Sequence, residues 1–376
     1  MTQSDYLRGG IDPIARPAPR STPINKKDGA PSFSRIPSID GLRAIAILIV
    51  MVSHGGLGRY VPGGFGVTIF FFLSGYLITT LLRLEHQRHG RVNLSAFYFR
   101  RALRILPPLY LTISFILLLT YINVLSGNIS IISTLIDVLF LTNYSQMLGV
   151  HSSAVIPLWS LDVEEHYYLM FPAIFVFLAS WRTGRAAILL CAICAVILLI
   201  RFLTFANFGE SQIYYWSHTR IDSIVFGSIL AMWQNPMLDK GAWRPHLIHI
   251  AFAFIIIGLT IVIRSPIFRE TLRYSLQGGA LFILFTAAIQ SRGIVARLLD
   301  QRWLRVVALL SYSLYLVHLP MLAATKPLGL WSVPVAYLLS FFWAAVLYTG
   351  VERPLARRRR RVLEKVIDGS PVPHSA

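Results

Sequence analysis

Long apolar runs recur through most of this 376-residue chain, separated by short stretches rich in arginine. A membrane-spanning helix needs about 20 predominantly apolar residues, and ten runs approach that length. They are 42–58, 65–83, 105–125, 160–181, 186–206, 220–234, 246–263, 275–290, 306–324 and 331–350. With 14% charged residues, against about a quarter in soluble domains, the composition excludes an ordinary soluble fold. The sequence therefore predicts an all-α polytopic membrane bundle of about ten transmembrane helices.

The positions of Lys and Arg predict the orientation of these spans. Most basic residues fall in alternate connections and in both terminal segments. Because basic residues are enriched in cytoplasmic loops, both termini are expected in the cytoplasm, with the bundle in the plasma (inner) membrane. An even number of crossings must then lie between 104 and 182. The short apolar segment 131–142 cannot cross alone, so it is predicted to be re-entrant or interfacial.

The composition of the ends predicts three segments. Residues 1–37 are polar and rich in Pro, Ser, Lys and Arg, as in a disordered cytoplasmic tail. Residues 38–356 form the membrane domain, and 357–376 form a basic cytoplasmic tail. The net charge of +18 is spread between spans, so we expect membrane lipids and not nucleic acid as partners. No metal site is predicted, since the C-x-x-C pair in an apolar run has no other soft ligand nearby.

Ionisable residues inside the apolar runs are the candidates for function, because burying charge in a membrane is costly. Arg43 starts the first span, and His54 lies roughly 16 Å further along that helix, in its outer half. Two spans that begin at the outer side, and one that ends there, are expected to bring ionisable groups to the same level. These groups are Glu164 and Glu165 in "LWSLDVEEHYYLMFP", Arg220 and Asp222 in "HTRIDSIVFG", and His318 in "SYSLYLVHLP".

A neutral histidine oriented by a carboxylate is a standard general base. His54 with Glu164 or Glu165 would form such a pair and take a proton from an acceptor hydroxyl. The sequence leaves open which carboxylate it is. The alternative is a buried polar network that only holds helices together.

A cluster of arginines, Arg100, Arg101 and Arg104, stands at the cytoplasmic entrance to the third span in "YFRRALRILPP". Guanidinium groups bind phosphate oxygens in pairs, so the cluster is a candidate phosphate site. The alternative is a topology signal that touches lipid headgroups. Pro107 and Pro108 predict a kinked or broken helix start.

Seven motifs in fixed order resemble the acyltransferase-3 family of bacterial membrane O-acyltransferases. They are "GLRAIAILIVMVSH", "FFLSGYLIT", "YFRRALRILPPLY", "LWSLDVEEHYYLMFP", "RIDSIVFG", "SYSLYLVHLP" and "ERPLARR". Members acylate sugars of lipopolysaccharide, exopolysaccharide, glucans, lipooligosaccharide signals or peptidoglycan, and sometimes macrolides, usually from cytoplasmic acetyl-coenzyme A. The resemblance thus implies an acyl-CoA donor and a glycan or glycolipid acceptor. The esterase-like domain fused to some members is not expected here.

The resemblance also implies roles for the ionisable groups of the first and third motifs. Arg43 and His54 match the essential pair of the first helix, which makes them candidate catalytic residues with the two carboxylates. Arg100, Arg101 and Arg104 match the arginine motif associated with the coenzyme A donor.

The remaining motifs imply residues of the acidic site and of acceptor binding. Trp159, Ser160 and Glu164 match the family's acidic motif, in which this chain has His166 where many members have glutamine. The candidate substrate-binding residues are Trp159, Ser160, Arg220, Asp222 and His318, and the roles of the last three stay open.

The residues and the resemblance together predict a transmembrane acyl relay. The arginine cluster would hold coenzyme A phosphates, Arg43 would guide the pantetheine arm, and His54 would activate the acceptor hydroxyl or carry the acetyl group itself. A proton-coupled secondary transporter of a small anionic or sugar-like solute is the alternative, although no repeat relates the two halves. Acceptor choice is expected to lie in the outer loops 207–219 and 264–274.

Overall fold

The computed structural model describes residues 36–358 apart from 128, 146, 148, 151–156 and 210–212. Every regular element in this part of the chain is a helix. The α-helices are α1 (Pro37–Val52), α2 (Gly63–His89), α3 (Leu94–Tyr121), α4 (Ile131–Val138), α5 (Leu158–Ala179), α6 (Thr183–Phe208), α8 (Ser217–Arg220), α9 (Asp222–Met232), α10 (Leu247–Val262), α11 (Pro266–Glu270), α12 (Leu272–Gln290), α13 (Ile294–Leu299), α14 (Arg302–Thr325) and α15 (Ser332–Leu347). Short 3-10 or π turns occupy Ser53–Leu57, Thr142–Tyr144, Lys326–Trp331 and Tyr348–Glu352. The predicted tails fall almost wholly outside the described residues.

The helices confirm an all-helical membrane architecture. Six stretches among the described residues are long and apolar enough to cross a membrane, one of which contains both α14 and α15. The apolar helices α9 and α10 are shorter, with 11 and 16 residues. The chain is a multi-pass membrane protein, while the number of about ten crossings stays a prediction. The predicted re-entrant segment contains α4, an eight-residue helix, and its place in the membrane also stays a prediction.

Local sequence signals set the ends of several helices. Pro37 occupies the first turn of α1, where its missing N–H is not needed. Asn93 caps α3 by accepting a hydrogen bond from the backbone N–H of Ala96 at 2.9 Å. The helix α3 then continues through Pro107 and Pro108, so it is not broken there, while a kink at these prolines stays a prediction.

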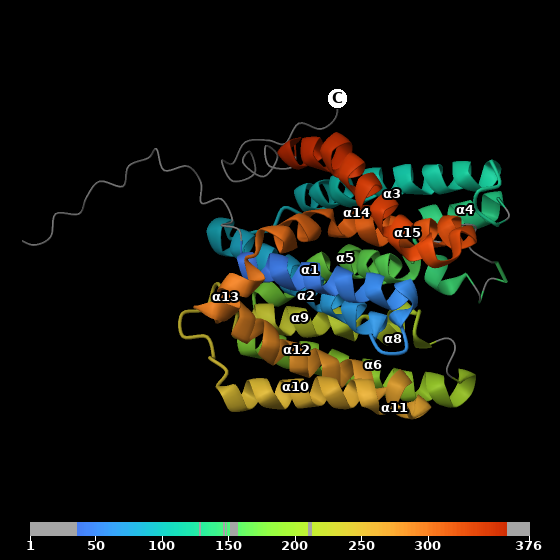
Figure 1. Ribbon diagram of the computed structural model, residues 1–376. Helices are drawn as coiled ribbons and strands as arrows, with labels where there is room; N and C mark the ends of the chain where they lie inside the picture. The colour runs from blue at the N-terminus through green and yellow to red at the C-terminus, as the bar shows by residue number, and fades with distance from the viewer. Residues whose placement is uncertain are drawn as a thin grey trace, which may run out of the picture. The chain divides into compact units, whose positions relative to one another are not determined.

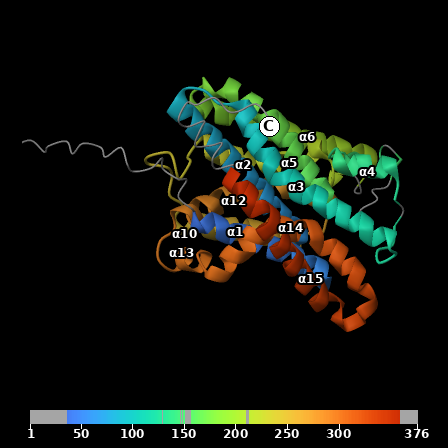
Figure 2. The ribbon, with the colours of Figure 1, turned by 90° about the horizontal axis from the view of Figure 1, so that it is seen from above.

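Figure 1 shows α1, α2, α5 and α9 stacked between α3, α14 and α15 on one side and α6, α10 and α12 on the other. The helix α2 is the most enclosed of the candidate spans, with 72% of its apolar window buried. It packs against α9, α1, α5 and α12, and Figure 2 shows it passing through the middle of the bundle. The core therefore lies around α2.

Two glycines let α2 and α9 approach at backbone distance, which is typical of small residues between membrane helices. A Cβ atom built on Gly75 of α2 would lie 1.9 Å from the carbonyl oxygen of Ile224 in α9. A Cβ atom on Gly227 of α9 would lie 1.9 Å from the carbonyl oxygen of Phe72 in α2. Any larger residue at either glycine forces these helices apart.

Candidate functional site

The end of α1 places His54 on a π-helical turn, Ser53–Leu57. Such turns arise where one extra residue is inserted, and they are frequent at functional sites. Gly56 has a φ of 105°, which a residue with a Cβ rarely adopts. The hydroxyl of Tyr337 in α15 donates a hydrogen bond to the carbonyl of Met51, just before this turn. The turn leaves His54 exposed.

His54 is paired with His318 of α14. Its Nδ1 lies 2.9 Å from Nε2 of His318, and the two rings stack with centroids 5.1 Å apart. The side chain of His318 is fully buried. Two histidines that lie 264 residues apart in the sequence thus form one imidazole pair.

The backbone around His318 determines which nitrogen of each ring carries a proton. Nδ1 of His318 lies 2.8 Å from the carbonyl oxygen of Tyr315 and 3.1 Å from that of Leu314. A carbonyl oxygen only accepts, so this nitrogen must carry hydrogen. In the neutral ring Nε2 is then an acceptor, and Nδ1 of His54 must donate to it. The lone pair on Nε2 of His54 is left free for a base or a nucleophile.

The structure corrects the partner predicted for His54, which is neither Glu164 nor Glu165. Glu164 accepts hydrogen bonds from Ser74 at 3.1 Å and from Tyr168 at 2.7 Å. These two groups hold its carboxylate on the face of α5 that meets α2 and α3. Ser160, one turn earlier on the same face of α5, bonds to Tyr315 of α14, which lies beside His318. The carboxylates therefore lie one turn or more further along α5 than the residue that reaches the surroundings of the histidine pair.

Instead, Glu164 lies with the predicted arginines of α3. Its Oε2 is 4.0 Å from Nη2 of Arg101, whose guanidinium stacks 3.5 Å above the ring of Tyr168. Arg104 acts electrostatically on both Glu164 and Glu165. The carboxylates and two of the predicted donor-binding arginines thus form one cluster, which we call the Arg101 cluster.

The other predicted residues of the first and third helices lie around this cluster. Arg43 acts electrostatically on Glu164, Arg101 and Tyr168. Arg100 is turned away towards α2, where it forms an ion pair with Glu85 at 3.2 Å. The three arginines of the motif therefore do not converge on one point.

Trp159 and Ser160 connect α5 to the histidine pair and to the loop before α8. The hydroxyls of Ser160 and Tyr315 form a short hydrogen bond, and the ring of Tyr315 lies 5.8 Å from that of His318. On the other side Trp159 packs against Tyr214, with centroids 4.8 Å apart. The motif thus forms a bridge between the predicted acceptor loop and the imidazoles.

Arg220 and Asp222 are both fully buried but have different surroundings. Asp222 forms an ion pair with Arg201 of α6 at 2.8 Å and also accepts from Ser275. Arg220 has no carboxylate partner among the described residues, and its guanidinium stacks 3.7 Å from the ring of Tyr274. The contacts of Asp222 are those of a structural ion pair, while Arg220 keeps unused hydrogen-bonding capacity.

Three residues of this site were missed in the sequence, although signals for them exist. Arg201 lies inside an apolar run, which is the same signal that marked Arg43. Tyr168 follows Glu164 by four residues and Tyr315 precedes His318 by three, which are spacings at which helical side chains meet.

Comparison with known proteins gives the chain its family. The model of an acyltransferase domain, acyltransferase 3, matches residues 36–351. The chain belongs to the acyltransferase-3 family. It is 28% identical over 350 residues to the O-acetyltransferase OatA of Staphylococcus aureus, covering 86% of this chain and 57% of the relative.

Two further relatives carry peptidoglycan in their names. The putative peptidoglycan O-acetyltransferase YrhL of Bacillus subtilis is 30% identical over 88% of this chain and 55% of its own length. The peptidoglycan O-acetyltransferase OatA of Listeria monocytogenes is 26% identical over 86% of this chain and 56% of its own length. The chain thus spans a little over half the length of these relatives. No solved structure matches it.

Proposed function

We propose that this acyltransferase-3 protein is a membrane O-acetyltransferase, which moves an acetyl group from acetyl-coenzyme A to a hydroxyl of a cell-wall glycan. The observation that carries the proposal is the His54–His318 pair, whose hydrogen bonds leave a lone pair on Nε2 of His54. The names of the relatives favour peptidoglycan as the acceptor. A transporter gains no support from these comparisons.

In the proposed transfer, Nε2 of His54 takes the proton of the acceptor hydroxyl. The hydroxyl oxygen attacks the carbonyl carbon of the thioester at the same time. The carbon–sulfur bond breaks, and the leaving thiolate takes the proton from the imidazolium to give free coenzyme A. His318 fixes the tautomer and orientation of His54 throughout, as the aspartate does in hydrolase triads. The same lone pair would attack the thioester if an acetyl-histidine intermediate forms.

Two arginines of α3 support the donor side of the proposal at separate positions, Arg101 in the Arg101 cluster and Arg100 beside α2. Arg100 Nη1 and Arg101 Nε are buried and have no hydrogen-bond partner among the described residues. Buried donors of this kind are costly unless a ligand accepts their hydrogen bonds, and guanidinium groups suit phosphate. We place the phosphates of coenzyme A at these two arginines, with Arg43 between them and His54 along α1. This arrangement requires the N-terminal end of α3, which carries these arginines, to face the cytoplasm.

The test is acetyl-coenzyme A-dependent release of thiol by the purified protein in detergent, with peptidoglycan oligosaccharides as acceptors. Because general base catalysis contributes about a hundredfold or more, His54→Ala should lower kcat/KM at least that far. His89→Ala is the matched control, since His89 is exposed at the far end of α2. Near-normal turnover by His54→Ala would refute the mechanism, and no thiol release with any acceptor would refute the function.

A further inference from the structure

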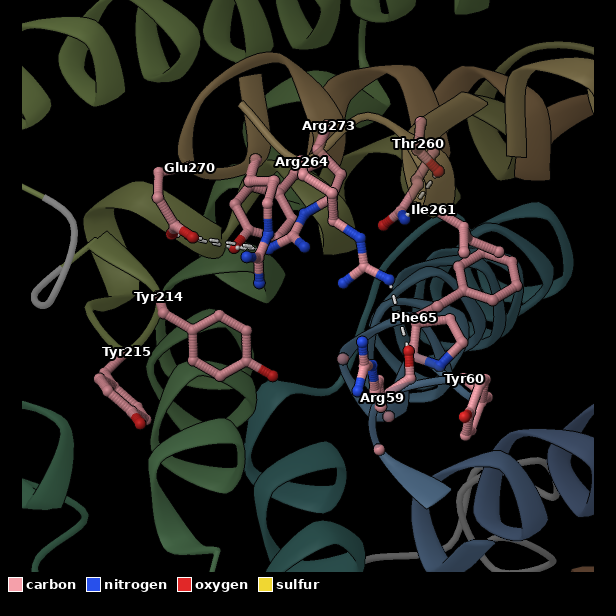
Figure 3. Close-up of a pocket in the computed structure, with 17 residues that line it drawn as sticks. Arg59, Tyr60, Phe65, Tyr214, Tyr215, Thr260, Ile261, Arg264, Glu270 and Arg273 are labelled. Carbon is pink, nitrogen blue, oxygen red and sulfur yellow. Dashed lines mark hydrogen bonds and ion pairs between the residues drawn. The ribbon is translucent and has the colours of Figure 1, made fainter. Parts of the chain in front are cut away.

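The turn after His54 opens into a cavity of about 570 Å³ at the same end of the bundle. Its walls come from the glycine-rich turn before α2, the loop before α8, the end of α10, and α11 with the start of α12. Figure 3 shows the guanidinium groups of Arg264 and Arg273 and the hydroxyl of Tyr214 directed into this space, with Arg59 opposite. The cavity joins the two loops in which acceptor choice was predicted. We call it the arginine pocket.

The arginine pocket has a strong excess of positive charge. Arg59, Arg264, Arg269 and Arg273 line it, against one carboxylate, Glu270. That carboxylate is paired with Arg273 at 3.8 Å. Arg264 donates to the backbone carbonyl of Arg59, at 3.4 Å. Within the described part of the chain, no carboxylate pairs with the other three arginines.

A buried cation behind the pocket wall adds to this excess. Arg220 is fully buried, and its guanidinium lies against the rings of Tyr274 and Tyr214, both of which line the pocket. Its Nε and Nη1 have no hydrogen-bond partner among the described residues. Its Nη2 donates a hydrogen bond to Thr68 at 3.4 Å. A cation in low-dielectric surroundings acts over a longer range than one in water.

Tyrosines give the pocket a surface that suits a sugar. Tyr60, Tyr214, Tyr215 and Tyr274 all line it, and a tyrosine combines an apolar ring with a polar hydroxyl. Burial raises the pKa of Tyr214 to about 12, so its hydroxyl stays a hydrogen-bond donor at neutral pH. A pocket with apolar faces and a few fixed polar groups is the usual form of a ligand site.

The pocket is connected to the histidine pair through neighbouring residues on both sides. The backbone N–H of Gly63 on its rim donates to the hydroxyl of Ser53, the residue before His54, at 3.1 Å. On the opposite side, Tyr214 packs on Trp159, and the adjacent Ser160 bonds to Tyr315 beside His318. A sugar held in the arginine pocket would therefore lie next to the imidazole pair.

We propose that the arginine pocket binds a carboxylate- or phosphate-bearing sugar of the acceptor, so that the enzyme selects acidic glycans. This inference rests on the proposed function. The anionic group pairs with Arg264 and Arg269 at the mouth, and the sugar ring packs on the tyrosines. A neighbouring hydroxyl then reaches Nε2 of His54.

The experiment compares two matched acceptors with the purified protein in nanodiscs of zwitterionic lipid. One is an oligosaccharide containing N-acetylmuramic acid with free carboxylates, and the other is its carboxamide derivative. Loss of one charged hydrogen bond corresponds to about tenfold to hundredfold in affinity. Arg264→Gln and Arg269→Gln should raise KM for the acidic acceptor by that factor with little change in kcat. KM for the amide should not move. Arg182→Gln, an exposed arginine outside the pocket, is the charge-matched control.

The outcomes separate this inference from the function it rests on. Thiol release that is equally efficient with both acceptors, and unchanged in both pocket variants, would overturn the pocket and leave the transferase intact. A second arm adds anionic phosphatidylglycerol to the nanodiscs. If the variants then differ from wild type only in its presence, the arginines bind lipid headgroups and the inference is wrong. Equilibrium binding of the labelled acidic oligosaccharide, weaker in Arg264→Gln but not in Arg264→Lys, would support it independently of turnover.

Discussion

Replacing His318 tests whether it controls the tautomer of His54. In His318→Leu the acceptor for Nδ1 of His54, now 2.9 Å away, is lost, and the imidazole is free to rotate and to place its proton on Nε2. Partners that orient a functional histidine in this way contribute tenfold to hundredfold, which is about 1.4–2.7 kcal/mol of transition-state free energy. We therefore expect kcat/KM for thiol release to fall by that factor.

His318→Gln is the matched variant, because its Oε1 can occupy the place of Nε2 and accept from His54. It should retain more activity than His318→Leu. Neither change should greatly alter thermal unfolding, since the carbonyls that Nδ1 contacts also belong to the backbone of α14. Wild-type kcat/KM in a folded His318→Leu protein would refute the tautomer argument. Equal losses in the two variants would show that His318 acts only through packing.

Three further changes test the surroundings of the site. Gly227→Ala places a Cβ atom 1.9 Å from a carbonyl oxygen of α2 and should lower stability by about 3 kcal/mol. Gly279→Ala, whose Cβ atom would have nothing within 4 Å, should leave stability unchanged. Thermal unfolding in detergent measures both variants. Asp222→Asn leaves the Arg201 cation unpaired and should lower the free energy of unfolding by about 3–5 kcal/mol. Adding Arg201→Met should recover most of this loss. A stable but inactive Asp222→Asn protein would instead indicate that Asp222 binds substrate. Tyr168→Phe removes a 2.7 Å hydrogen bond to the carboxylate and should lower kcat/KM for acetyl-coenzyme A about tenfold; an unchanged value would exclude that bond from donor binding.

The positions of the helices could be predicted because they depend on local sequence. Each of the ten apolar runs overlaps a helix, since unpaired backbone groups are too costly in a membrane. The continuity of α3 through Pro107 and Pro108 could not be predicted in this way, because neighbouring helices decide how a proline is accommodated.

The pairing of functional side chains could be predicted only in part. The pattern of ionisable residues identified His54, His318, Glu164 and Arg101, all of which have polar or charged partners in the structure. Which of them meet depends on how far α5 and α14 are shifted along each other, and a single sequence does not specify that. The sequence did not predict the pocket either, because its arginines and Tyr214 come from segments that only the fold brings together.

The close packing of Gly75 on Ile224 and of Gly227 on Phe72 also limits how this protein can work. Two helices whose backbones touch in this way resist sliding or rotating past each other, so we expect α2 and α9 to move together. A carrier that exposes its cargo alternately to two compartments must move one half against the other. The proposed transfer needs no such movement, because its travelling part is the flexible arm of the donor. The proposal therefore lets the donor reach the imidazole through a bundle whose central helices keep their places.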